Sequence, residues 1–306
     1  MVKTLLITTS AYNYLQAPLL EAYPERFEAG SICRQKFPDE ESYLRIETEI
    51  AGRHVCLIGG TINDESTLEL FDLANGCFQL SALSLTIILP YFGYSTMERS
   101  TKPGEIVKAK TRALLLSSIP KTPMGNKIVM VDLHAEGIPY YFDGDVQTQH
   151  IYSKPLIAQT VKKIAGEDFV LASTDAGRAK WVESLGNDLN VKCAFIYKKR
   201  LSGETTEILA INAPVRDKIV VIYDDIIRTG GTLMQAAAAY HQAGALQIFA
   251  VCTHGILAND VMNKIEKQGL IQKVFVLNTH PNSIKINHPL LEVVDFLPLL
   301  ENCFYD

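Results

Sequence analysis

The sequence lacks the features of a secreted protein, a membrane protein or a cysteine-ligated metal protein. Its six cysteines are scattered, and none of them has the short spacing of a metal-binding pair. The longest apolar stretch, residues 80–94, is interrupted by Ser, Thr, Pro90 and Gly93, so we do not expect it to span a bilayer. The first ten residues have too short an apolar core for a signal peptide. These absences predict a cytoplasmic protein with reduced thiols and no membrane partner.

An excess of basic charge is also missing. The formal net charge is −5, so no global positive field favours nucleic acid as a partner. Any phosphate-binding site must therefore use local groups. The chain has no low-complexity segment and no composition break that would mark a linker. Its 306 residues, 47% of them hydrophobic, are sufficient for a sizeable core and suggest two domains.

Apolar β-rich runs alternate with amphipathic helical patterns through most of the chain, which is typical of an α/β protein with a mainly parallel sheet. The expected strands are 4–8, 54–58, 85–89, 127–131, 169–172, 194–196, 218–223, 246–252 and 273–277. The expected helices include 65–79, 147–164, 175–189 and 231–243. A polar turn with a glycine at 143–146 precedes a second α/β series, so we expect domains at 1–145 and 146–306.

The most informative segment is KIVVIYDDIIRTGGTL, residues 218–233. An apolar run precedes Asp224 and Asp225, and residues 229–232, Thr-Gly-Gly-Thr, then lead into a helical pattern. The first N–H groups of a helix lack internal partners and, together with the helix dipole, favour an anion such as phosphate. Two aspartates would repel a phosphate, so beside one they suit sugar hydroxyls or a hard divalent cation. The segment indicates a site for a phosphorylated sugar, with an ordinary strand-to-helix turn as the alternative.

Three other predicted strands also end in charged or metal-capable residues. Asp132 and His134 follow the strand at 127–131, and Asp175 follows the strand at 169–172. Residues 198–200, Lys-Lys-Arg, follow the strand at 194–196. Ligands of open parallel sheets bind at the carboxyl ends of the strands, so these residues predict a shared site. Taken singly, each has a structural explanation: a core histidine, a helix N-cap and a solvated charge run.

In chain order, these motifs resemble those of ribose-phosphate pyrophosphokinases over residues 37–279. Segment 218–233 resembles the phosphoribosyl-binding loop, with Arg228 in place of the usual aspartate. Residues 37–41, Phe-Pro-Asp-Glu-Glu, resemble the family's Phe-Pro-Asp-Gly-Glu, with Glu40 in place of glycine. Residues 131–134, 175–177 and 198–200 are similar to the family's histidine motif, its diphosphate loop and the start of its mobile catalytic loop.

The resemblance implies two phosphoribosyltransferase-like α/β domains. The N-terminal domain would lie on the nucleotide side and the C-terminal domain would hold ribose 5-phosphate, with the last residues free to pack on the first domain. The implied reaction transfers diphosphate from Mg-ATP to the anomeric hydroxyl of ribose 5-phosphate, giving 5-phosphoribosyl 1-diphosphate and AMP. The implied cofactor is Mg²⁺, with ATP as co-substrate.

Roles for individual residues follow from the same resemblance. Lys198 and Arg200 would stabilise charge on the transferred group, and Asp225 is a candidate to assist deprotonation of the anomeric hydroxyl. His134 and Asp175 would hold the metal and the triphosphate. The remaining implied contacts are the nucleotide with Phe37, Asp39, Glu41, Arg99 and His134; the diphosphate with Asp175, Ala176 and Gly177; the ribose hydroxyls with Asp224 and Asp225; and the 5-phosphate with Arg228, Thr229, Gly230, Gly231 and Thr232.

The sequence departs from the family pattern in one direction. The family's nucleotide loop usually reads Ala-Arg-Gln-Asp-Arg-Lys, whereas residues 95–100 here read Ser-Thr-Met-Glu-Arg-Ser. Arg178 replaces a glycine of the diphosphate loop, and Arg228 adds a cation near the sugar phosphate. Charge is lost at the adenine end and gained near the phosphates. Donor choice at Thr96 and Met97, and the roles of the two arginines, stay open at this point.

Three functions are compatible with the motifs. The retained charged residues favour an active synthetase, and the altered nucleotide loop suggests a weakly active regulatory homologue. A phosphoribosyltransferase is disfavoured because the matches extend through the N-terminal half. The family assembles into dimers and hexamers in which a segment resembling residues 37–39 reaches a neighbour's nucleotide site, so we expect a homo-oligomer. Control by ADP or phosphate stays open.

Overall fold

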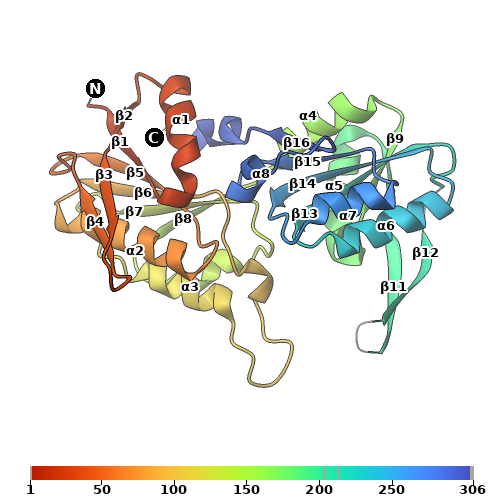
Figure 1. Ribbon diagram of the computed structural model, residues 1–306, viewed down its shortest axis with the longest axis horizontal. Coiled ribbons are helices and arrows are strands. Elements are labelled where there is room, and N and C mark those ends of the chain that lie inside the picture. The colour runs from red at the N-terminus through yellow and green to blue at the C-terminus, as the bar shows by residue number, and fades with distance from the viewer. Residues whose placement is uncertain (1, 203–204, 212–213, 304–306) are drawn as a thin grey trace. The chain divides into compact units, whose positions relative to one another are not determined.

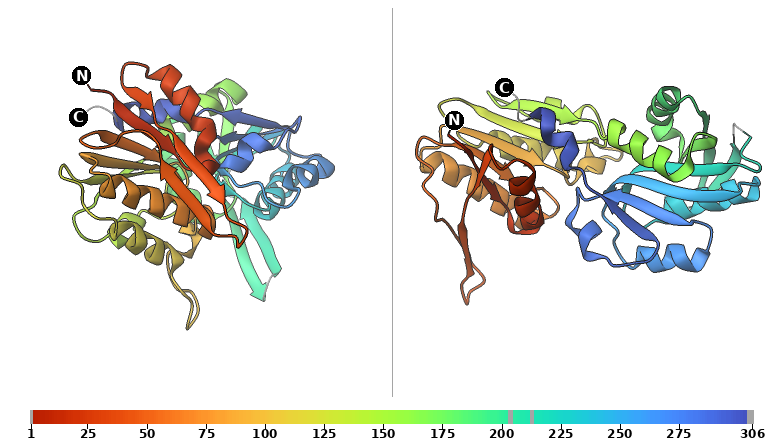
Figure 2. Two further views of the ribbon diagram at one scale, coloured as in Figure 1. Left: turned by 60° about the vertical axis from the view of Figure 1, so that its left-hand side comes forward. Right: turned by 90° about the horizontal axis from the view of Figure 1, so that it is seen from above.

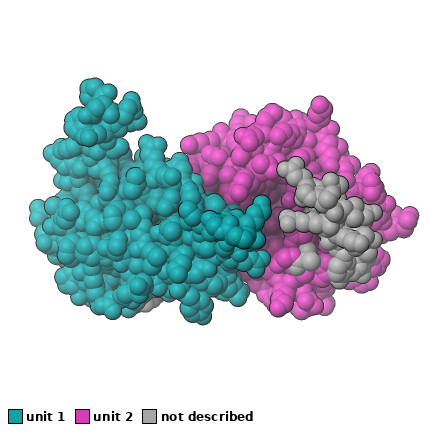
Figure 3. Space-filling view, turned by 90° about the horizontal axis from the view of Figure 1, so that it is seen from below, with its two compact units in different colours: residues 1–152, 300–306 teal, residues 153–299 magenta. Residues whose placement is uncertain are grey.

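The structure of the chain is a computed structural model that describes residues 2–202, 205–211 and 214–303, without the side chains of 176, 197–202, 205–211 and 302. Two compact units are present, Met1–Tyr152 with Leu300–Asp306, and Ser153–Leu299, coloured separately in Figure 3. We describe each unit by itself.

The first unit contains a six-stranded parallel sheet with the strand order β2-β1-β5-β6-β7-β8 (Figure 1). A separate antiparallel hairpin, β3–β4, follows the second strand. The strands are β1 (Thr4–Thr8), β2 (Phe27–Ala29), β3 (Ile32–Lys36), β4 (Ser42–Ile46), β5 (His54–Ile58), β6 (Ser84–Leu89), β7 (Asn126–Val131) and β8 (Gln147–Ile151). The α-helices are α1 (Gln16–Ala22), α2 (Asp64–Gln79) and α3 (Lys108–Ser117), and the 3-10 helices are η1 (Ser10–Leu15), η2 (Ser95–Met97) and η3 (Ile138–Tyr141).

The second unit contains another six-stranded parallel sheet, in the order β10-β9-β13-β14-β15-β16, and the antiparallel hairpin β11–β12. Its strands are β9 (Phe169–Ser173), β10 (Lys192–Ala194), β11 (Ile196–Ser202), β12 (Thr205–Ile211), β13 (Ile219–Ile227), β14 (Gln247–Gly255), β15 (Lys273–Leu277) and β16 (Leu291–Val294). Its helices are α4 (Lys154–Ala165), α5 (Ala179–Leu189), α6 (Gly231–Gln242), α7 (Val261–Gln268) and α8 (Pro281–Lys285), with η4 (Ala176–Arg178) and η5 (Leu297–Cys303).

The two units repeat one topology. In each sheet the second strand lies at the edge, the first strand lies next to it, and the remaining strands follow in chain order. In each unit the antiparallel hairpin is inserted directly after the second strand of the sheet. Figure 1 shows the two hairpins, β3–β4 and β11–β12, extending away from their sheets. The predicted α/β class with mainly parallel sheets is confirmed.

Each unit has its own hydrophobic core. In the first unit, apolar residues of α2 and α3 pack with the sheet in one cluster. In the second unit, α6 and α7 supply the helical side of the main cluster, which α4 and α5 do not join. The green helices α4 and α5 cover the other face of that sheet (Figure 2). Strands covered on both faces are apolar throughout, which explains why they read as continuous hydrophobic runs.

Several predicted elements need correction. The helix expected at 147–164 is wrong, because residues 147–151 form β8 and α4 begins only at Lys154, with Pro155 in its first turn. Because β8 pairs with β7, the boundary between the units falls after Tyr152 and not after 145. The strand expected at 194–196 is the junction of β10 and β11. β13 continues four residues past its predicted end at 223. Within the described residues, no helix is both long and apolar enough to cross a bilayer.

The turn after β6 depends on Gly93. Its N–H donates to Oγ1 of Thr61 at 2.8 Å, and a Cβ built on Gly93 would lie 1.9 Å from the carbonyl oxygen of Thr61. The next residue, Tyr94, has a φ of +62° and caps η2. This contact therefore sets where residues 95–100, the altered nucleotide loop, leave the sheet.

Gly93→Ala should destabilise the protein by about 3 kcal/mol, because the obstructing atom is backbone and has little room to move. Gly76→Ala in α2 is the matched control. Its nearest contact would be Ile46 Cδ1 at 3.4 Å, and alanine favours a helix, so no loss is expected. Urea unfolding followed by circular dichroism measures both variants. Equal stability of the two variants would contradict the close contact.

Candidate active site

Asp224 and Asp225 lie on β13 beyond the end of its neighbour β9. The ladder between β13 and β9 ends at the pair Tyr223 and Ser173, whereas the ladder between β13 and β14 continues to Ile227. The aspartates are thus part of the strand, but one of its edges is unpaired at their position. That open edge lies at the carboxyl end of β9, where the loop containing Asp175 begins.

Arg178 is the ion-pair partner of Asp225. Its Nε donates to Oδ1 of Asp225 at 3.0 Å, and its Nη2 contacts Oδ2, so the pair is bidentate. The side chain of Asp225 is 5% exposed and that of Arg178 is 17% exposed. The arginine that replaces a glycine of the diphosphate loop therefore lies against a carboxylate that the sequence assigned to sugar hydroxyls. Asp225 is covered by it in this structure.

Asp224 has a different environment. Its Oδ2 accepts a hydrogen bond from Thr174 Oγ1 at 3.0 Å, and its Oδ1 accepts from the N–H of Asp225 at 3.0 Å. Burial, and then the charge of Asp225, raise the pKa of Asp224, while Thr174 and the more distant Arg178 oppose that rise. The two carboxylates thus have different surroundings: Asp225 is paired with a cation, and Asp224 has a raised pKa.

The loop after β13 forms a small cavity at the start of α6. The cavity has a volume of about 110 Å³ and is lined by Asp224 and residues 226–233. Gly230 caps the helix with a φ of +74°, and the first helical bond runs from the N–H of Met234 to the carbonyl of Gly230 at 2.8 Å. The amides of residues 231–233 precede that bond and lie at the positive end of the helix dipole. The side chains of Thr229, Thr232 and Arg228 are exposed.

The segment after β14 holds this loop in place. The N–H groups of Leu257 and Ala258 donate to the carbonyls of Ile227 and Arg228 at 3.0 and 2.8 Å. These bonds pair two carbonyls of the loop with the backbone that follows β14. A concave site near a helix start with its amides available in this way is suited to a phosphate group.

The loop expected to bind diphosphate is held by hydrogen bonds between its own residues. Oδ1 of Asp175 accepts the N–H of Gly177 at 2.8 Å, and Ser173 Oγ donates to the carbonyl of Asp175 at 2.6 Å. The side chain of Ala176 lies outside the described part of the structure. Lys198 and Arg200 lie on β11, where they pair with Ile208 and Thr206 of β12, but their side chains are also outside the described residues. Their predicted roles are not tested here.

His134 belongs to the first unit, whereas the residues above belong to the second. It is half-buried and follows β7 after Asp132, which is buried and has a φ of +46°. The N–H of Leu133 donates to Nε2 of His150 at 2.9 Å, which holds this turn against β8. Among the described residues, no group of three or more His, Cys, Asp or Glu side chains is arranged to hold a metal ion. The predicted ligands His134 and Asp175 belong to different units.

The other nucleotide candidates lie on exposed turns of the first unit. Phe37 is 45% exposed and packs edge-on against Tyr43 with the ring centroids 5.9 Å apart. Asp39 Oδ1 accepts the N–H of Glu41 at 3.2 Å, so the hairpin turn is locally ordered. Glu40, which replaces a glycine, has a φ of +72°, a conformation that favours glycine. Arg99 pairs with Glu98 at 3.3 Å, and its side chain is 78% exposed.

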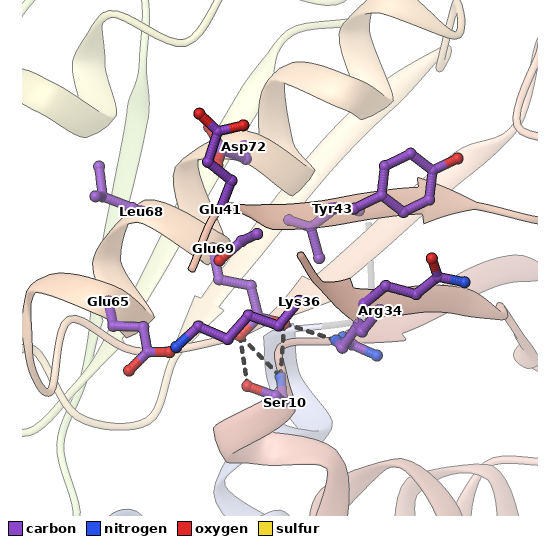
Figure 4. A pocket seen from close by; sticks show the side chains of 12 residues that line it. Ser10, Arg34, Lys36, Glu41, Tyr43, Glu65, Leu68, Glu69 and Asp72 are labelled. Atoms are coloured by element: carbon purple, nitrogen blue, oxygen red, sulfur yellow. Dashed lines mark hydrogen bonds and ion pairs between the residues drawn. The ribbon is translucent and has the colours of Figure 1, made fainter. Parts of the chain in front are cut away.

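Glu41 also lines a pocket between the hairpin β3–β4 and α2. The pocket has a volume of about 630 Å³, and Figure 4 shows its side chains. Glu69 on α2 accepts hydrogen bonds from Ser10 and from Arg34 Nε, the latter at 2.7 Å. Through Arg34, this contact joins the middle of β3 to α2.

Sequence reasoning missed two residues that support the acidic pair. Trp181, the single tryptophan, stacks on Tyr223 with centroids 3.7 Å apart and an interplanar angle of 8°. Tyr223 directly precedes Asp224, and Thr174 bonds to Asp224 from the end of β9. One signal was present: the tryptophan lies three residues after Arg178, one turn into α5, so it had to face the same region.

Gly230→Ala should lower the free energy of unfolding by about 1–3 kcal/mol, because alanine is strained at a φ of +74° and its Cβ would lie 2.5 Å from Val261 Cγ2. Gly231→Ala is the control, since no atom lies within 4 Å of the added Cβ. Urea unfolding followed by Trp181 fluorescence compares the two. A loss of similar size in both variants would contradict the assigned loop geometry.

Asp224→Asn should stabilise the protein more near pH 8 than near pH 5, with a difference of about 1 kcal/mol or more. Because the folded-state pKa of Asp224 is raised, the folded protein binds more protons than the unfolded chain, and wild-type stability falls as pH rises above about 3.9. Asparagine removes that loss. The measurement is urea unfolding at both pH values, and a stabilisation independent of pH would disprove the assignment.

Comparisons with known proteins agree with this geometry. A family model described as the N-terminal domain of ribose phosphate pyrophosphokinase matches residues 5–119, and one described as the phosphoribosyl synthetase-associated domain matches residues 180–304. The ribose-phosphate pyrophosphokinase of Fusobacterium nucleatum is 33% identical over 247 residues, which are 79% of this chain and 76% of that protein. The chloroplastic ribose-phosphate pyrophosphokinase 2 of Arabidopsis thaliana is 30% identical over 278 residues, 89% of this chain and 68% of that protein.

A solved structure extends the likeness to the whole fold. The crystal structure of phosphoribosylpyrophosphate synthetase from Mycobacterium smegmatis superposes with a TM-score of 0.87 at 25% identity, and the match covers 99% of this chain and 98% of that one. Two family domains in the expected order, relatives that match over most of their length and a shared fold lead to one conclusion: the chain belongs to the ribose-phosphate pyrophosphokinase family.

Proposed function

We propose that this chain transfers a diphosphate group from ATP to the anomeric hydroxyl of ribose 5-phosphate, giving 5-phosphoribosyl 1-diphosphate and AMP. One observation supports it above the others: the cavity at the start of α6 is lined both by helix amides and by Asp224. A phosphate and the hydroxyls of the sugar that carries it need those two kinds of group side by side.

This arrangement indicates where the sugar phosphate would bind. The cavity volume of about 110 Å³ leaves room for several water molecules, and therefore for one phosphate group. The amides of residues 231–233 and the hydroxyls of Thr229 and Thr232 would donate to the 5-phosphate. Asp224 would then accept hydrogen bonds from the ribose hydroxyls at the mouth of the cavity.

We propose acid–base roles for the two aspartates that differ from the sequence expectation. A guanidinium on both oxygens stabilises the ionised form of Asp225 and makes it a weak base. Asp224 has the raised pKa that a general base near neutral pH needs. We therefore assign acceptance of the hydroxyl proton to Asp224 and not to Asp225.

Stabilisation of the transferred phosphoryl charge is assigned to Lys198 and Arg200 on the hairpin β11–β12. Phosphoryl groups carry dense negative charge, so catalysis depends mainly on positioning and on cations near the transferring phosphorus. The hairpin that carries both residues begins directly after the carboxyl end of β10.

The part of the chain that the structure describes offers few ligands for a Mg²⁺ ion, so the phosphates of the nucleotide would have to supply the others. The described residues of neither unit offer three ligands, and Mg²⁺ commonly binds through one or two protein groups, waters and the phosphates of a nucleotide. His134 and Asp175 would hold it together with the triphosphate. When bound, it neutralises charge on the phosphate oxygens.

A homo-oligomer, a dimer or a hexamer, is part of this proposal. Phe37 and Tyr43 are exposed aromatic residues on one hairpin, and exposed aromatics are enriched at protein interfaces. Size-exclusion chromatography with light scattering, on the wild type and Phe37→Ala, tests this directly, and a monomeric wild type would refute it.

AMP release from Mg-ATP, with and without ribose 5-phosphate and with GTP or CTP as other donors, tests the reaction. We expect release with ATP that depends on the sugar.

Lys198→Ala and Arg200→Ala should lower kcat by about 100-fold or more and change ribose 5-phosphate affinity much less. Lys192→Ala, an exposed lysine on β10, is the control and should behave as wild type. Silence with every donor in folded protein would refute the reaction.

A further inference from the structure

We propose that Arg178 is a diphosphate-binding residue and that Asp225 is the positioning residue that holds it. This inference rests on the proposed function, since the ligand is the diphosphate group that the reaction transfers. It differs from the expectation from the sequence, in which Asp225 contacts ribose, and it gives a role to Arg178, which the sequence left open.

The exposure of the pair supports this assignment. Both oxygens of Asp225 face the guanidinium, and 5% of the Asp225 side chain is exposed against 17% of the Arg178 side chain. A ligand that approaches this edge of the sheet therefore meets the arginine first. A guanidinium fixed by a bidentate carboxylate is pre-organised, so little rotamer freedom is lost when an anion binds.

The backbone hydrogen bonding of the neighbouring loop also supports this assignment. The N–H of Gly177 donates to Oδ1 of Asp175 at 2.8 Å, so this loop amide already has an acceptor within the loop. A diphosphate at this loop needs other donors. Arg178 directly follows Gly177, and a guanidinium binds phosphate oxygens with paired N–H groups.

Charge supports the assignment independently. Without Arg178, the edge of β13 would present two adjacent carboxylates to a multiply charged anion, and like charges at such distances repel strongly in a partly buried site. Arg178 offsets the charge of Asp225. A neutral sugar hydroxyl would not need this cation, whereas a diphosphate does.

The position of Asp224 identifies the ligand as one molecule with two anionic ends. Asp224 lines the phosphate cavity, and its Oδ2 accepts from Thr174, the residue before Asp175. Asp224 thus borders the cavity and directly precedes Asp225, the residue that holds Arg178. A ribose with its hydroxyls at Asp224 would direct its 5-phosphate to the cavity and its 1-diphosphate to Arg178.

The test compares binding of inorganic diphosphate and of ribose 5-phosphate to the full chain. The variants are Arg178→Ala, Arg178→Lys, Asp225→Asn and the control Arg216→Ala, an exposed arginine that precedes the opposite end of β13. Trp181 fluorescence and calorimetry report binding, and circular dichroism shows that each variant is folded. AMP release gives kcat and KM for each substrate.

We expect Arg178→Ala to weaken diphosphate about tenfold or more and ribose 5-phosphate less than about threefold. Arg178→Lys should recover part of the loss, because it keeps the charge without the paired geometry. Asp225→Asn should weaken diphosphate less than Arg178→Ala does, since the cation remains but is no longer held. Arg216→Ala should match the wild type.

Three results would overturn the inference: unchanged diphosphate binding in Arg178→Ala, equal weakening of both ligands, or tighter ribose 5-phosphate binding, which would make Arg178 a cover over Asp225. Failure of the proposed function is a separate outcome. A wild type that releases no AMP but binds diphosphate through Arg178 would refute the reaction and keep the binding residue.

Discussion

Two adjacent carboxylates at the carboxyl end of an interior strand, β13, are the constraint on which this site depends. Charge buried in this way is unfavourable unless it is paired and hydrogen-bonded. Arg178 pairs with Asp225, and Thr174 and a backbone amide bond to Asp224. These partners come from the end of β9 and from the turn before α5, so the acidic pair fixes the loop between them. Trp181, one turn further, stacks on Tyr223, which directly precedes Asp224.

The repeated topology explains why the second unit can present such a site. In both units, a hairpin follows the second strand and leaves the sheet near its carboxyl end. In the first unit the hairpin turn carries Phe37, Asp39 and Glu41, which we relate to the nucleotide. In the second unit the hairpin carries Lys198 and Arg200, which we relate to the transferred group. In the function that we propose, one arrangement would supply two different kinds of substrate contact, according to which side chains the hairpin bears.

Much of this could be predicted from local sequence. The strands β1, β5 and β15 agree with the expected bounds residue for residue, because fully buried parallel strands are short apolar runs bounded by polar turns. β8 was mistaken for the start of a helix, since QTQHI is polar and half-buried with no periodic signal. The Arg178–Asp225 pair could not be predicted, because it joins residues 47 positions apart through the pairing of β9 with β13. The positive φ of Glu40 was likewise not predicted, because residues other than glycine rarely adopt that conformation.

The coupling between Arg178 and Asp225 is the quantity on which the account depends. It can be measured by a double-mutant cycle with Arg178→Ala, Asp225→Asn and both together, from urea unfolding reported by Trp181. We predict that the loss of stability in the double variant is smaller than the sum of the single losses by about 1 kcal/mol or more, because each single variant leaves a charged partner without its counterpart. Single losses that add to within about 0.5 kcal/mol would contradict the ion pair and the binding site built on it.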